Sequence, residues 1–189
     1  MRGWVVSLTK WIIFLALIVV VSWGGCKLMD RGRQLSFVPV AMNVSRILYA
    51  AERSGGIGPG ANETGIIVYE MPDEIVRQLK LNGIAYLQEL APNTGLGLRR
   101  RYPKWHATPV VGSPKWRTPT ICDSGRPSSI CPGIRDFMFR YLSTPFDVDI
   151  EHMVNEAIFK KGSYYAFGRS GTLLILSPYS KRIVFAYNG

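Results

Sequence analysis

The pattern of apolar and polar residues divides the chain into a uniformly apolar N-terminal stretch and a longer mixed part. Residues 11–23 contain no charged residue and no proline, and no side of a helix built from them would be polar. A helix that crosses the roughly 30 Å of bilayer hydrocarbon needs roughly 20 apolar residues. Extending the stretch back to Trp4 supplies that length. The pattern therefore predicts a transmembrane anchor, with interfacial indole rings at Trp4, Trp11 and Trp23.

Two alternatives for the same stretch stay open. A basic start, an apolar run to Val21 and the small residues Ser22 and Gly24 also match a cleaved secretory signal peptide. Cys26, which follows two glycines, is compatible with a lipid-modified cysteine. Basic residues flank the run on both sides and fix its orientation only weakly. The short N-terminal tail favours a single-pass inner-membrane protein with a periplasmic C-terminal domain.

The mixed part of the chain alternates between helical and strand patterns. Helical spacing predicts four helices, and apolar runs between turn-forming residues predict four strands. The expected helices cover residues 43–53, 72–91, 133–142 and 147–161. The expected strands cover residues 65–71, 164–168, 172–177 and 182–187.

Short turns join the last three expected strands, which favours an antiparallel meander. The expected strand at 65–71 joins or flanks this meander, and the helices pack on one face of the sheet. We therefore predict an α+β fold. The anchor occupies residues 1–26, a juxtamembrane linker residues 27–41, and one α+β soluble domain residues 42–189.

A long irregular loop at 93–133 interrupts this domain. It contains two similar segments in which a cation and an indole lie between prolines: residues 103–109 with Lys104 and Trp105, and residues 114–119 with Lys115 and Trp116. One hypothesis is a binding loop in which the rings stack and the cations contact anions. The other is that both rings pack the loop onto the domain. The candidate binding residues are Arg99, Arg100, Arg101, Lys104, Trp105, Lys115, Trp116 and Arg117.

The net charge of +10 is concentrated at two places. Residues 1–33 carry +4 and residues 94–126 carry +6, whereas the remaining charges cancel. A neutral body with a basic loop indicates a local anionic contact and argues against a general nucleic-acid-binding protein.

Cys122 and Cys131 bracket a short segment that is rich in turn-forming residues. We expect a disulfide between them, because such bonds persist in oxidising compartments; two free thiols are the alternative. A zinc site is not expected, since the chain lacks the close cysteine spacing of such sites and offers only His106 and His152 as further ligands.

Sequence motifs for catalysis are weak. The glycine-rich segment at 54–60 follows an expected helix and precedes an expected strand, which is the reverse of a dinucleotide-binding fingerprint. Glu70, Asp73 and Glu74 follow the expected strand at 65–71, but helix capping accounts for the last two. We therefore expect no enzyme, cofactor or metal.

The leading hypothesis for function is a membrane-anchored, non-enzymatic envelope protein whose periplasmic domain binds another envelope protein. The alternative is a module that binds a membrane surface or an anionic ligand through the basic loop at 99–117.

Overall fold

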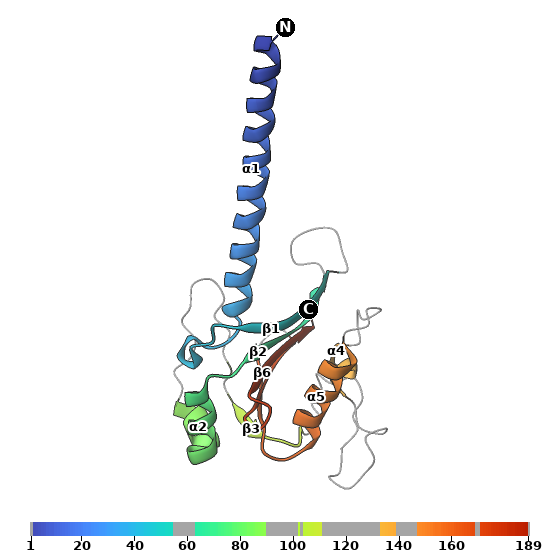
Figure 1. The fold of residues 1–189 in the computed structure, drawn as a ribbon. Coiled ribbons are helices and arrows are strands. Elements are labelled where there is room, and N and C mark those ends of the chain that lie inside the picture. The colour runs from blue at the N-terminus through green and yellow to red at the C-terminus, as the bar shows by residue number, and fades with distance from the viewer. Residues whose placement is uncertain are drawn as a thin grey trace. The chain divides into compact units, whose positions relative to one another are not determined.

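The computed structural model describes residues 2–54, 63–89, 102, 104–110, 133–138, 147–168 and 171–188. The chain forms two compact units, Met1–Ser36 and Phe37–Gly189. Figure 1 shows the elements of both units in chain order.

The first unit is the single helix α1, Arg2–Leu35. Residues 27–35, which we expected in a linker, continue this helix. No proline occurs before Pro39, and Arg33 pairs with Asp30 at 3.0 Å, one turn back. The helix ends at Leu35. At the next residue, Ser36, the backbone N–H donates to the carbonyl of Gly32 and the hydroxyl donates to the carbonyl of Arg33 at 2.7 Å.

The predicted transmembrane anchor was wrong. Among the helices of the described residues, none combines the length and the apolarity that crossing a bilayer requires. The uncharged stretch lies between Lys10 and Lys27 and is shorter than the roughly 20 residues that the hydrocarbon thickness demands. The same finding overturns the prediction of a single-pass inner-membrane protein with a periplasmic domain.

The second unit is built on a six-stranded sheet with the order β1-β2-β6-β5-β4-β3. Its strands are β1 Ile47–Ser54, β2 Glu63–Glu70, β3 Trp105–Ala107, β4 Tyr164–Phe167, β5 Thr172–Ser177 and β6 Arg182–Asn188. Every neighbouring pair is antiparallel. The predicted meander is present as β4-β5-β6. The predicted sheet of three strands plus one was wrong, because β1 and β3 were missed.

Strand β1 replaces the helix that we predicted over residues 43–53. Apolar residues at Ile47, Leu48 and Ala51 fit a helical spacing in so short a segment, and periodicity alone does not separate the two structures. The chain instead pairs with β2 over residues 47–54, with a bulge between Ile47 and Tyr49. Pairing with the strongly apolar β2 therefore overrides the local helical pattern.

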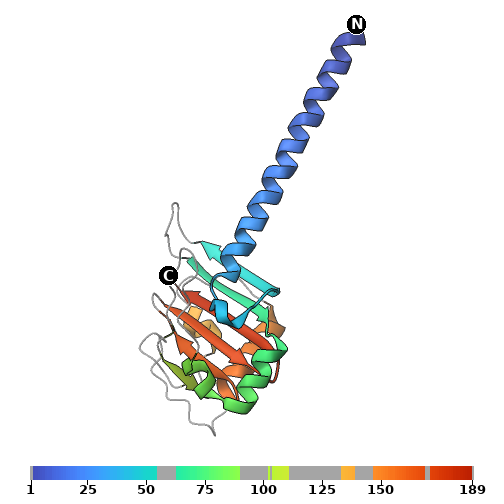
Figure 2. The same cartoon turned by 90° about the vertical axis from the view of Figure 1, so that its left-hand side faces the viewer.

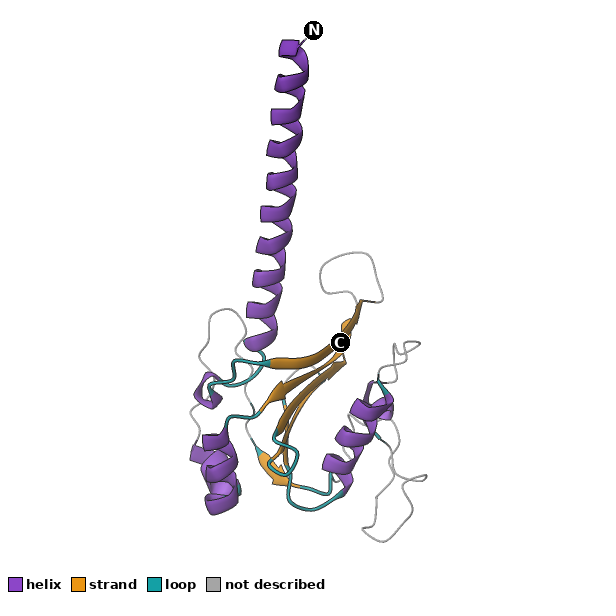
Figure 3. Cartoon of the chain, in the orientation of Figure 1, coloured by secondary structure: helices purple, strands orange, loops and turns teal. Residues whose placement is uncertain are grey.

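Helices cover both faces of the sheet, so the prediction that they pack on one face was also wrong. Helices α4 Ile134–Met138 and α5 Val148–Phe159 lie on one face, and α2 Asp73–Asn82 and α3 Ile84–Glu89 lie on the other (Figures 1, 2 and 3). The physical reason is that the central strands are apolar on both faces: all six residues of β5 are buried. Two apolar faces require two covering layers.

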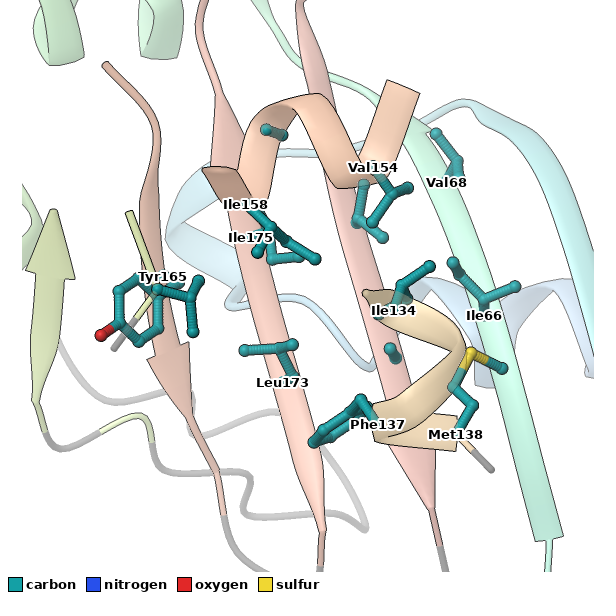
Figure 4. Close-up of a cluster of buried hydrophobic side chains, with 14 residues drawn as sticks. Ile66, Val68, Ile134, Phe137, Met138, Val154, Ile158, Tyr165, Leu173 and Ile175 are labelled. Carbon is teal, nitrogen blue, oxygen red and sulfur yellow. The ribbon is translucent and has the colours of Figure 1, made fainter. Parts of the chain in front are cut away.

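The core beneath α4 and α5 takes alternate residues from four strands: β2, β4, β5 and β6, the last through Val184 and Ala186. Figure 4 shows Ile66 and Val68 of β2, Tyr165 of β4, and Leu173 and Ile175 of β5 gathered under the two helices. The helices contribute Ile134, Phe137, Met138, Val154 and Ile158. The opposite face of β6 carries Phe185, whose ring lies 4.8 Å from the ring of Phe37.

A row of three residues crosses β1, β2 and β6 and fixes the outer strand. Glu52, Gly65 and Tyr187 are paired across the ladder. The Tyr187 hydroxyl donates to Oε1 of Glu52 at 3.0 Å. Its ring passes so close to Gly65 that a Cβ on that residue would lie 2.6 Å from it. Gly65 thus leaves the space through which the ring reaches β1.

Replacing Gly65 by Val should lower the free energy of unfolding by about 1–3 kcal/mol, because the added side chain would displace a buried ring. Tyr187→Phe should cost about 1 kcal/mol, because it removes one hydrogen bond. Urea unfolding followed by circular dichroism measures both. Ala50→Val, at an exposed site of β1, is the control and should stay near the wild type. A Gly65→Val variant with the same free energy of unfolding as the wild type would contradict this role of Gly65.

Surface ion pairs join charged residues on the helices and at the strand ends of the second unit. Lys181 donates to Asp73 at 2.8 Å and lowers the pKa of that carboxyl group. Hydrogen bonds from Arg77 and then Gln78 lower the pKa of Glu74, and Lys160 lowers the pKa of Glu156. All three carboxyl groups are at the surface, where each pair contributes little and salt screens it.

Because these pKa values are lowered in the folded protein, the stability of the fold depends on pH in a direction that can be predicted. A depressed native-state pKa stabilises the fold above the unfolded-state value, and this stabilisation is lost as pH falls through the native-state value. The difference in unfolding midpoint between wild type and Lys181→Gln should therefore be present at pH 6. It should disappear as the pH falls below the ordinary aspartate value of 3.8. A difference that grows on acidification would contradict the assignment, and 1 M NaCl should reduce it.

Candidate functional site

The outer side of β1 is the longest exposed strand edge of the sheet. β1 has eight residues and occupies one end of the strand order, so within the described segments it pairs with β2 alone. Its outward N–H and C=O groups form a row that another strand can extend. The opposite edge, β3, has only three residues.

Side chains along β1 are partly exposed and mostly apolar. Leu48 is 37% exposed, Ala50 is exposed, and Ile47 and Ala51 are half-buried. Charged residues stand near the two ends, Arg46 and Glu52. The edge therefore has an apolar middle and a polar rim, which is the distribution typical of protein-binding surfaces.

Contacts at three places hold β1 in position. Arg46 pairs with Glu70 at 3.2 Å, and the Glu70 N–H donates to the carbonyl of Arg46. The hydroxyl of Tyr49 accepts a hydrogen bond from the Asp147 N–H at 3.2 Å, at the start of α5. With the Tyr187–Glu52 bond at the other end, the strand is fixed from both faces of the sheet.

The predicted basic loop is only partly described. Lys104 is exposed, whereas Trp105 is 6% exposed and lies in β3 opposite Ala166. The ring of Trp105 lies 6.0 Å from that of Tyr102. For this tryptophan the structure thus favours our packing hypothesis over a role in stacking on a ligand. The other six candidates, Arg99, Arg100, Arg101, Lys115, Trp116 and Arg117, lie outside the described residues.

Thr108 secures the segment that follows β3. This residue precedes a cis proline and is 5% exposed. Its hydroxyl donates to the carbonyl of Lys160 at 2.6 Å, and its N–H donates to the carbonyl of Ser163 at 2.9 Å. The end of α5 and the start of β4 therefore anchor this part of the loop.

The structure describes only some of the cysteines and tryptophans named from the sequence. Cys122 and Cys131 lie outside the described residues, and the described part of the chain contains no disulfide, so the predicted bond is not supported. Trp11 and Trp23 are exposed on α1, at 63% and 66%. Trp4 belongs to the same helix.

The carboxylates considered for catalysis are engaged in ion pairs. Glu70 pairs with Arg46, Asp73 with Lys181 and Glu74 with Arg77. His106 stacks on Tyr165, with 5.2 Å between the ring centroids. Over the residues that the structure describes, no group of His, Cys, Asp and Glu side chains is arranged to hold a metal ion.

The apolar spacing of residues 43–53 predicted a helix, so the β1 edge was not predicted from the sequence. A signal was available: a glycine-rich connection between two apolar runs is also the pattern of a β-hairpin. Comparisons of the chain with models of protein families, with curated proteins and with solved structures found no match.

Proposed function

We propose that the second unit is a non-enzymatic module that binds another protein, and that the partner adds a strand to β1. The exposed β1 edge carries this proposal. In strand addition, main-chain hydrogen bonds supply affinity, and side chains on alternate positions supply specificity.

The length and composition of β1 support this mode of binding. Eight residues form a strand of about 26 Å at roughly 3.3 Å per residue. Leu48 and Ala50 offer apolar surface without bulk, which leaves space for a partner strand. Natural proteins protect such edges with charged side chains, above all lysine, or with prolines, bulges or covering segments. β1 contains neither lysine nor proline.

The rigidity of the edge supports the proposal further. The bonds to Glu52, Tyr49 and Arg46 fix β1 before any partner arrives. A preformed edge avoids part of the ordering cost of association. The bulge at Leu48 turns one side chain out of the regular alternation, and this side chain marks the position where we expect the partner to be recognised.

The decisive test compares the two edges of the sheet in the full chain. A photo-crosslinking amino acid at Leu48 should give a discrete adduct with the partner protein in cells that express the chain. When Ala50→Lys is introduced into the chain that carries the crosslinker at position 48, the yield of this adduct should fall at least tenfold, because an edge lysine opposes strand pairing. Ala107→Lys, at the exposed end of β3, is the matched control and should leave the adduct unchanged.

Both lysine variants should retain the wild-type circular dichroism spectrum and unfolding midpoint, because both sites are exposed. An adduct that is equally strong with Ala50→Lys would contradict strand addition at β1. Loss of the adduct in both variants would contradict it as well, because the effect would then not depend on the edge.

A second candidate, the anionic-ligand module, rests on the distribution of charge. The basic excess of the domain lies in residues 94–126, and five of the basic residues elsewhere in the second unit are in ion pairs: Arg46, Arg77, Arg135, Lys160 and Lys181. Each cation near an anionic lipid surface contributes about 1 kcal/mol to binding.

Replacing Arg99, Arg100, Arg101, Lys104 and Lys115 by Gln should abolish the preference of the full chain for phosphatidylserine vesicles over neutral vesicles. The control replaces five cations elsewhere, at Lys27, Arg31, Lys80, Lys161 and Arg182. Co-sedimentation at low and high salt measures the preference. An unchanged preference in the first variant would remove this candidate without affecting the proposal for β1.

A further inference from the structure

Phe37 begins the second unit and packs against two aromatic rings of β6. It follows the last residue of α1, Leu35, by two positions and is 2% exposed. The centroid of its ring lies 4.8 Å from that of Phe185 and 6.1 Å from that of Tyr187. The rings of Phe185 and Tyr187 stack with 5.5 Å between their centroids. We call these three side chains the ring cluster.

The ring cluster reaches β1 through the hydroxyl of Tyr187. This hydroxyl donates to Oε1 of Glu52 at 3.0 Å, and the ring crosses β2 at Gly65, which has no side chain in its path. Glu52 belongs to the C-terminal half of β1. A residue of β6 therefore holds a strand that is not its neighbour in the sheet.

Phe37 restricts the direction in which Tyr187 points. The ring of Tyr187 is 7% exposed, and contacts with the two phenylalanine rings limit the rotamers that it can adopt. Removing the ring of Phe37 would leave unfilled volume beside Tyr187. The tyrosine ring could then turn into this volume, and its hydroxyl would lose Glu52.

The segment that contains Phe37 is itself packed into the second unit. The hydroxyl of Tyr102 donates to the carbonyl of Phe37 at 3.1 Å, and Val38 and Met42 are 2% and 0% exposed. The chain then enters β1 at Ile47. The segment therefore acts on β1 twice, through the chain at the start of the strand and through the ring cluster near its end.

We infer that Phe37 is a positioning residue for the β1 edge, and that it holds the C-terminal half of this strand in place through Tyr187 and Glu52. The inference rests on the proposed strand addition, because a strand that is already held needs less ordering when a partner pairs with it. A displacement of the segment that leaves α1 would therefore weaken partner binding at β1.

Two neighbouring amides of β2 separate a loosening of β1 from general unfolding. The Asn188 N–H donates to the carbonyl of Gly171, so the backbone of Asn188 faces away from β2. The backbone of its partner Thr64 therefore faces β1. By alternation the N–H of Ile66 also faces β1, whereas the N–H of Ile67 faces β6. Both isoleucines are fully buried, which makes them a matched pair.

Amide hydrogen exchange in the full chain, measured by NMR, tests the inference. Phe37→Leu keeps most of the buried volume and should accelerate exchange at Ile66 at least tenfold more than at Ile67, because β1 opens locally. Tyr187→Phe should give the same pattern. The double variant should exchange no faster at Ile66 than either single variant, since both changes remove the same bond. Leu79→Ala, equally buried in α2, is the control and should accelerate both amides by similar factors.

The photo-crosslinking adduct at Leu48 gives a second readout, taken at a temperature where all variants are folded. Phe37→Leu should lower its yield at least threefold, whereas Leu79→Ala should leave it unchanged. Equal acceleration of Ile66 and Ile67 by Phe37→Leu, or an unchanged adduct yield, would overturn the inference. A wild-type chain that gives no adduct would instead overturn strand addition itself, which the exchange measurement does not require.

Discussion

The structure of the second unit depends on the burial of β2, β5 and β6 on both faces. These strands form the middle of the six-stranded sheet, and the cores on the two sides are made by alternate residues of the same strands. Ile66 and Val184 face α4 and α5, whereas Ile67 and Phe185 face the opposite layer. A strand of this kind is stable only when both layers are in place, because an exposed apolar face would forfeit about 25 cal/mol per Å². The helical layers are therefore a consequence of the strand sequences.

Burial of the middle strands leaves the edges as the places where the sheet can bind. β3 is short, and its tryptophan points into the protein. β1 is longer and partly exposed, and it is held by the contacts of Tyr187 with Glu52 and of Asp147 with Tyr49. One of these contacts lies on each face of the sheet, and the packing of the core already holds both faces in place. The candidate binding edge thus takes its rigidity from the same packing that stabilises the fold.

The two units differ in whether their apolar side chains are buried or exposed. The second unit buries them between layers, and five ion pairs join charged residues at its surface. The first unit, α1, has no second layer of its own: its apolar side chains are exposed, and its glycines have open space around them. The helix therefore contrasts with the strands of the second unit, whose apolar residues are covered by layers of the same unit.

Local sequence determined a substantial part of this protein. Strong apolar runs and short turns determined β2 and the β4-β5-β6 meander, and helical spacing with Asp147 as cap determined α5. The uneven charge and the uncharged N-terminal run are likewise properties of the sequence. Only the tertiary structure decided that residues 47–54 form a strand, because a segment with apolar residues at Ile47, Leu48 and Ala51 fits both periods. It also decided that Trp105 is buried, since proline and indole spacing do not reveal which layer a ring packs against. The apolar N-terminal run specified a helix, but its composition did not specify what surrounds that helix, because a membrane span and a packing helix share the same residues.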